Sequence, residues 1–396
     1  LLLQGEGICF KKICMNNFKD IPFYIRLVLT LLMLSLIGVI IFLGQDIIVP
    51  FGFALLISVL LLPVNNFLEK IKVPRVLSIM ISLTIALIFI AGILYFLTTQ
   101  IARFMSDMPA IQEHLNMHLH TLQKWLNTTF NLTTTEQTKI IDNAATQLKD
   151  SGTGALGQTF LTVTQAMAFL LLIPVYSFLL LYYRDMIRKF LVDVFKDEHE
   201  QKVAEVLKES RTIVQSYMAG LIIEMAIVAA MNAAGFIIIG VEYAVLLGVM
   251  SAILNMIPYI GGLIATIICM LITLTTSQDI NDIFWVAVIL TIVQFIDNNI
   301  LMPKVVSSKV KINALISILG VLIGGALAGV SGMFLSIPAI AILKVIFDRV
   351  DDLKPWGMLM GDEITGSQKS QLYKRLKKIK YSSKKKAASA EALSEV

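Results

Sequence analysis

The sequence predicts an all-α, polytopic membrane protein. Of its 396 residues, 57% are hydrophobic and 15% are charged, whereas soluble domains average about 25% charged residues. Several apolar runs approach or exceed the ~20 residues that a helix needs to cross a bilayer. Alternating ten-residue strands, which mark membrane barrels, are missing from the sequence. We therefore expect about eight spans plus a C-terminal helical hairpin, with broken helices and amphipathic helices outside the bilayer.

The N-terminal region, 1–97, is expected to hold a cytoplasmic segment and the first three spans. Lysines precede the first apolar run, 25–43, and a basic excess of this kind marks the cytoplasmic side. The second run, 51–62, is brief, so it either spans with a tilt or re-enters. A basic loop at 63–75 leads into the third span, which ends near residue 97.

The next three segments alternate in character. Residues 98–158 are polar, lack a basic excess and place apolar residues at helical spacing, which predicts an extracytoplasmic region of amphipathic helices. A fourth span follows at 159–183. Residues 184–216 mix acidic and basic residues with one apolar side, which predicts a cytoplasmic helical connector.

The C-terminal part is expected to form a transport core, 217–347, and a basic cytoplasmic tail, 348–396. Nine lysines and arginines gather in 366–396. Beside a membrane span, such a cluster favours anionic lipid head groups over nucleic acid. We therefore expect both termini in the cytoplasm and no nucleic-acid partner.

The first candidate site is a helix break inside an apolar run. Residues 244–257 form a run of 14 residues, which rises about 21 Å as a helix and falls short of a ~30 Å hydrocarbon core. The sequence PYIGG (258–262) then predicts irregular backbone at membrane depth, where protein or water must satisfy it. The alternative is a kinked, tightly packed helix crossing. The candidate residues are Asn255, Pro258, Tyr259, Gly261 and Gly262.

The second candidate site is a polar cluster within the apolar run 283–302. Polar groups are costly in hydrocarbon and normally face a bundle interior, a cavity or a ligand. This cluster consists of Gln294, Asp297, Asn298 and Asn299. Transporters build their sites from broken helices and polar side chains, so we expect the cluster and the break to face a shared aqueous pocket.

A further span, 217–239, contributes Glu224 and Asn232 to the candidate substrate- or ion-binding residues. Glu224 and Asp297 are carboxylates within spans, where each could bind a proton or a monovalent cation. The alternative is a carboxylate at a wet boundary, or one paired with a lysine such as Lys304 or Lys344.

Glycines divide the last apolar region, 314–347, near its middle. Two apolar arms around such an apex predict a tight helical hairpin or a broken helix. Glycines four residues apart also favour close helix packing. The expected hairpin and packing residues are Gly324, Gly325, Gly329, Gly332 and Pro338.

The sequence contains no Walker A sequence, dinucleotide fingerprint or nucleophile elbow. His114, His118 and His120 lie close in sequence but lack an HExxH pattern or a partner cysteine. We expect neither an enzyme nor a cofactor or metal site.

With these residues identified, the chain resembles the AI-2E family of bacterial transporters from residue 23 to 361. The resemblance is carried by NMIPYIGG (255–262), QFIDNNILMPKVV (294–306), GGALAGVSGMFLSIPAIAILKVI (324–346), PFGFALLISVLLLPVNNFLEK (50–70) and DLKPWGMLMGD (352–362). The family pattern often has Glu-Gly-Asn where this chain has Asp297-Asn298-Asn299.

The resemblance implies a multi-pass protein of the bacterial cytoplasmic membrane that exports small polar solutes. Autoinducer-2, a quorum-sensing signal, is the named example. It also implies a homo-oligomer. Some relatives look like cation/proton antiporters, so the alternative function is Na⁺ or Li⁺/H⁺ exchange. A third possibility, outside transport, is a membrane scaffold that acts through the basic tail.

Overall fold

The computed structural model describes eight ranges of the chain: 22–107, 117, 171–195, 200–258, 260–277, 279, 281–306 and 312–361. Within these ranges every regular element is helical and none is a strand, so the predicted all-α class is confirmed. Several predictions lie wholly or partly outside the described residues: the cytoplasmic segment before residue 22, the three histidines, the region 98–158 beyond residue 107 (residue 117 apart), the start of the fourth span (159–170), Tyr259 and the basic cluster of the tail.

Five of the described helices are long and apolar enough to cross a membrane, which makes the chain a multi-pass membrane protein. They are α3 (Gln45–Lys70), α4 (Arg75–Ser106), α8 (Glu200–Ile239), the continuous pair α11 (Asn281–Ile296) and η1 (Asp297–Val306), and α12 (Ala314–Arg349). Shorter apolar helices are α2 (Phe23–Leu43), a helix at Leu171–Tyr182, α9 (Ala244–Asn255) and α10 (Gly261–Thr276).

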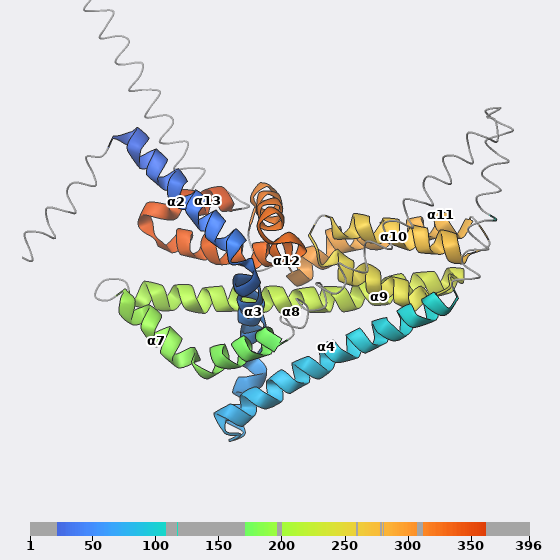
Figure 1. The fold of residues 1–396 in the computed structure, drawn as a ribbon, viewed down its shortest axis with the longest axis horizontal. Coiled ribbons are helices and arrows are strands. Elements are labelled where there is room, and N and C mark those ends of the chain that lie inside the picture. Colours follow the sequence, from blue (N-terminus) through green and yellow to red (C-terminus); the bar gives the residue numbers. More distant parts are fainter. Residues whose placement is uncertain are drawn as a thin grey trace, which may run out of the picture.

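Helix α8 is the element on which the others pack. Figure 1 shows it as a long yellow-green rod, with α9, α10 and α11 along one half and α12 toward the other. It contacts α3, α9, α11, α12, η1 and α7 (Arg184–Val194). The connector boundary predicted at residue 216 is not a structural break. Residues 200–219 contain no glycine or proline, so the helix runs on into the span.

An apolar cluster joins α8 to the three helices along its one half. Phe236, Leu247, Cys269 and Val286 come from α8, α9, α10 and α11 in turn and are all fully buried. Lipid tails are as apolar as these side chains, so close van der Waals packing rather than exclusion of water holds the four helices together. The cluster holds α9 and α11 beside α8, the helix that carries Glu224.

Helix α3 is longer than predicted. The loop expected at 63–75 is wrong for residues 63–70, which are helical through Pro63. A proline removes one main-chain donor from a helix, and other contacts can offset that loss. Here Asn65 is buried, and the Ser78 hydroxyl donates to its backbone oxygen at 2.9 Å and also to its side-chain oxygen. This contact ties the last turns of α3 to α4.

Helix α12 folds back on itself, as the glycine pattern predicts. The backbone leaves helical geometry at Ala328 and at Gly329, whose φ of 59° is a left-handed value that favours glycine. The two arms, 314–327 and 330–349, pack so closely that a Cβ atom on Gly332 would lie 2.0 Å from the Gly324 carbonyl oxygen. Both glycines are required for this contact, and the predicted hairpin is confirmed.

The residues after the hairpin return to its start. Asn313 caps α12 by accepting a 2.9 Å hydrogen bond from Ile316 N–H, and its amide donates to the Leu359 carbonyl at 2.5 Å and the Gly361 carbonyl at 3.3 Å. Leu359 belongs to α13 (Lys354–Met360). Residues 350–361 therefore pack with the core rather than forming the start of a separate tail.

A short 3₁₀ turn, η2 (Asp351–Leu353), links α12 to α13 beside the start of α8. Hydrogen bonds from Lys354 and Lys202 hold the pKa of the Asp351 carboxyl below its usual value. The Lys202 ammonium lies 3.2 Å from this carboxylate. The ionised Asp351 thus links the beginning of α8 to the end of the hairpin.

Candidate functional site

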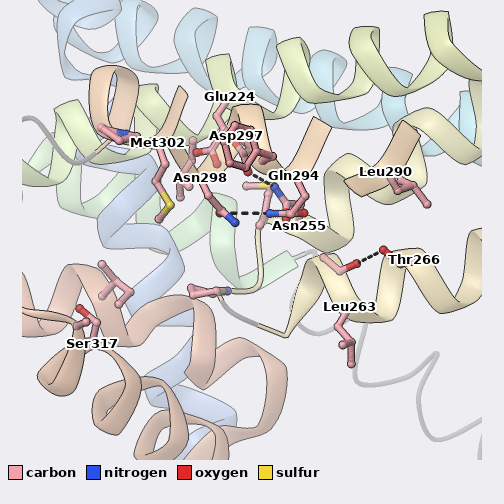
Figure 2. Close-up of a pocket in the computed structure, with 18 of the residues that line it drawn as sticks. Glu224, Asn255, Leu263, Thr266, Leu290, Gln294, Asp297, Asn298, Met302 and Ser317 are labelled. Atoms are coloured by element: carbon pink, nitrogen blue, oxygen red, sulfur yellow. Dashed lines mark hydrogen bonds between the residues drawn. The ribbon is translucent and has the colours of Figure 1, made fainter. Parts of the chain in front are cut away.

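The helix break and the polar cluster lie together, as predicted. Helix α9 ends at Asn255 and α10 begins at Gly261. The Asn255 amide donates a 2.8 Å hydrogen bond to Asp297, and Figure 2 shows Gln294, Asn298 and Asp297 beside it. A Cβ atom on Gly262 would lie 2.4 Å from Gln294 Oε1. Glycine at 262 therefore allows the start of α10 to approach the cluster.

Asp297 begins a π-helical segment. The ten residues of η1 continue α11 with the wider π geometry and include Pro303. Such segments are rare and are frequently found at functional sites. The Asp297 side chain is buried, whereas Asn298 and Asn299 are exposed. The start of η1 thus holds a buried carboxylate next to two exposed amides, of which Asn298 lines the pocket described below.

Glu224 of α8 faces Asp297. The two carboxyl groups are 6% and 2% exposed and lie close enough to interact directly. Glu224 Oε2 and Asp297 Oδ1 are buried and have no hydrogen-bond partner within the described part of the chain. A buried charge without an oppositely charged partner is costly in free energy. Two like charges side by side cost more. Packing alone does not account for this pair.

The lysines considered as partners for these carboxylates lie elsewhere. Lys344 is 2.5 Å from Asp348, in the same helix, and Lys304 is exposed. Among the ion pairs of the described residues, none includes Glu224 or Asp297. Neither Lys304 nor Lys344 is therefore the partner of these carboxylates, and no other lysine in the described ranges pairs with them.

A pocket of about 890 Å³ lies between α8, the break, α10, α11, η1 and the first turn of the hairpin. Its size is within the roughly 300–1,000 Å³ typical of small-molecule sites. Apolar side chains such as Leu263 and Met302 share the lining with polar ones (Figure 2). The polar lining residues include Glu224, Asn255, Gln294, Asp297, Asn298 and Ser317.

A second, much smaller chamber lies behind Asp297. Its volume is about 10 Å³, and Asn232, Ser251, Asn255, Thr266 and Asp297 are among its lining residues. The Asn232 amide donates to the Ser251 hydroxyl at 2.8 Å, while Asn232 Oδ1 is buried and has no partner among the described residues. The predicted residue Asn232 thus lies near the main pocket but does not line it.

The remaining predicted residues divide into lining and packing positions. Pro258 and Gly262 line the pocket. Gly261 packs against the end of α9, where a Cβ atom would lie 1.9 Å from the Leu254 carbonyl oxygen. Asn299 does not line the pocket, and its amide donates to the Phe295 carbonyl at 2.8 Å. Tyr259 lies outside the described residues.

Gly324, Gly325 and Gly332 lie where the two arms approach each other closely, Gly329 forms the turn and Pro338 is buried in the second arm. None of these five residues lines the pocket. The hairpin instead presents Ser317 and Ile337, which sequence reasoning missed. It also missed Thr266, whose hydroxyl donates to the Gly262 carbonyl at 2.8 Å. Thr266 could have been found, because it lies one helical turn after a candidate glycine. In the described ranges, no three His, Cys, Asp or Glu side chains gather as a metal site requires.

Comparison with known proteins decides the family. The family model described as AI-2E family transporter matches residues 29–352, which include all of the pocket. The chain belongs to the AI-2E transporter family. This agrees with the resemblance carried by the break, the polar cluster and the hairpin.

Individual relatives of the AI-2E family cover most of the chain at low identity. The "AI-2 transport protein TqsA" of Escherichia coli (strain K12) is 26% identical over 85% of this chain and 96% of its own length. The "Putative transport protein YrrI" of Bacillus subtilis (strain 168) is 26% identical over 76% of this chain and 86% of its own length. Most of the relatives' names state transport without a solute, and none supports the cation antiporter alternative.

Proposed function

We propose that this protein exports a small polar solute such as autoinducer-2 across the bacterial inner membrane, or facilitates its passage. One observation carries the proposal. The α9–α10 break, η1 and α8 place several hydrogen-bonding side chains around one pocket of about 890 Å³ between membrane-spanning helices. Polar groups at such a depth are costly unless they serve a solute or an ion path.

The chemistry of the lining supports a hydroxylated, polar solute. Asn255, Gln294 and Asn298 carry amides, each of which both donates and accepts hydrogen bonds. The Gln294 amide donates to Asn298 at 3.3 Å, a long bond that a solute hydroxyl can replace. Apolar lining residues lie beside these amides, and a less polar surrounding strengthens each bond to a solute.

The orientation and assembly of the protein belong to the same proposal. We propose that α7 and the charged start of α8 face the cytoplasm. The end of α12, where Arg349 pairs with Glu205 and Glu209 of α8, would face the same side. The basic tail would lie on anionic head groups there. We also propose a homo-oligomer, whose subunit number native mass spectrometry of the full chain in detergent would measure.

The test is export of autoinducer-2 from a bacterial strain that lacks its own exporter. The wild-type protein should lower the intracellular level, and Asn298→Leu should not. Asn299→Leu is the matched control, because the neighbouring amide does not line the pocket. An intracellular level that the wild-type protein leaves unchanged would count against the proposal, as would equal loss in the two variants.

A further inference from the structure

We propose that Glu224 and Asp297 together hold one exchangeable proton in the wall of the pocket, and that solute passage is coupled to its movement. The coupling rests on the proposed function, whereas the proton site does not. The proton would leave the pocket through the small chamber at Asn232.

The closeness of the two carboxyl groups requires that one of their two negative charges be removed. The two groups come from different elements, α8 and η1, and interact directly while almost fully buried. Like charges this close, with little water around them, are not both ionised. One proton on the pair would also supply the donor that two carboxylates lack, at a site where Glu224 Oε2 and Asp297 Oδ1 have no partner among the described residues.

Among the residues that the structure describes, no basic side chain lines the pocket beside the pair to neutralise it. The described residues that line the pocket and the chamber include no lysine, arginine or histidine, and Tyr217 of α8 is the other titratable one. On η1, Lys304 is exposed, and on α12, Lys344 pairs with Asp348. Helices α9 and α11 place no charged group there, and Cys269 of α10 belongs to the apolar cluster. A proton is therefore the simplest charge that balances the site.

Asp297 is held so that one oxygen stays available. Its Oδ2 accepts from the Asn255 amide at 2.8 Å, while Oδ1 remains without a partner in the described chain. An amide cannot neutralise a carboxylate, but it fixes the position of the group. The proton can thus be exchanged without moving Asp297.

The small chamber places a second set of polar groups next to Asp297, on the side of Asn232. Its volume of about 10 Å³ is close to the roughly 10–15 Å³ that a single water molecule needs. Asp297 lines both the chamber and the pocket, and Asn232 Oδ1 is a second unpaired acceptor at the chamber. One water between them would have polar partners on both sides and could relay the proton.

The proton site is tested on the purified, reconstituted full-length chain by infrared spectroscopy. At neutral pH, we expect the carbonyl band of a protonated carboxylic acid, which shifts in heavy water. Glu224→Gln and Asp297→Asn should each remove it, and Glu242→Gln, at an exposed position between α8 and α9, should retain it. Asn232→Leu should keep the band but slow its shift in heavy water. A wild-type spectrum without the band overturns the proton site.

If the two carboxylate variants misfold, the wild-type and Asn232→Leu spectra alone decide whether the proton site exists. A monovalent cation is the competing occupant. If Na⁺ or Li⁺ abolishes the band in the wild-type protein at constant pH, the site binds cations and the proposal of a dedicated proton is overturned. An unchanged band in these salts supports the proton.

Coupling is tested in proteoliposomes that contain autoinducer-2 and a pH-sensitive dye. Solute efflux by the wild-type protein should move protons, and an imposed pH gradient should change the efflux rate. In Asp297→Asn, efflux should lose this dependence. Efflux without proton movement overturns the coupling and leaves the proposed function intact. A carboxylic acid band in a protein that moves no autoinducer-2 overturns the proposed function and leaves the proton site intact.

Discussion

Asn255 donates a 2.8 Å hydrogen bond to Asp297, 42 residues further along the chain. The bond joins the two positions where core helices become irregular, since Asn255 ends α9 and Asp297 begins η1. A break in a membrane helix leaves main-chain and side-chain groups that need partners. Here the partner of one irregular segment is the other, and the pocket lies between them.

Asn255→Leu should reduce both stability and export. The substitution removes the bond and leaves Asp297 Oδ2 without its donor, which costs about 1–3 kcal/mol for a buried group. Thermal unfolding in detergent measures the first effect, and the intracellular autoinducer-2 level measures the second. Asn255→Asp should be worse still, because it adds a third carboxyl beside Glu224 and Asp297. A variant Asn255→Leu with wild-type stability would show that the bond does not join the two segments.

Gly262→Ala should impair export more than stability. The added Cβ atom would lie 2.4 Å from Gln294 Oε1, and this flexible side chain can move aside into the pocket. In the double variant Gly262→Ala, Gln294→Ala, the shortened side chain at 294 no longer clashes with the added Cβ atom. The unfolding midpoint of the double variant should therefore be close to that of Gln294→Ala alone. Gly38→Ala is the control, because no atom lies within 4 Å of the position of its Cβ. Equal export by Gly262→Ala and Gly38→Ala would contradict the close approach of α10 to the cluster.

Gly332→Ala should destabilise the hairpin directly. Its Cβ atom would lie 2.0 Å from the backbone oxygen of Gly324, which cannot move without separating the two arms. Gly92→Ala in α4 meets nothing within 4 Å, and alanine is favoured over glycine inside a helix by roughly 0.5–1 kcal/mol. The unfolding midpoints should therefore shift in opposite directions. Wild-type stability of Gly332→Ala would mean that the arms are not packed through these glycines.

The sequence predicts much of this architecture, because composition and breaker residues act locally. The PYIGG break, the hairpin around Gly329 and the association of the break with Asp297 follow from apolar length and polar cost. What it misses depends on tertiary contacts. Helix α3 continues through Pro63, and a hydrogen bond from Ser78 of α4 to Asn65 holds its last turns.

The site was harder to predict at the level of single residues. Neighbouring amides on a helix point in different directions, so Asn298 lines the pocket and Asn299 does not. The π geometry of η1 sets these directions, and no periodic pattern in the sequence predicts a π-helix there. Glu224 and Asp297 were each recognised as costly groups, but their direct contact depends on how α8 packs against η1.

Asn313→Ala should lower stability and export more than Arg349→Gln, although Arg349 makes ion pairs. Asn313 caps α12, and losing a cap costs about 0.5–2 kcal/mol. Its amide also holds the Leu359 and Gly361 carbonyls, so the substitution frees α13 and the first turn of the hairpin, where Ser317 lines the pocket.

Arg349 pairs with Glu205 and, at 2.7 Å, with Glu209, but it is 40% exposed, and such surface pairs contribute about 0–1 kcal/mol. Unfolding midpoints at low and high salt should separate the two effects. The small loss in Arg349→Gln should disappear in high salt because ions screen exposed charges, whereas the loss in Asn313→Ala should persist. The reverse order of stability would mean that the ion pairs to α8, rather than the cap and α13, hold the hairpin against the pocket.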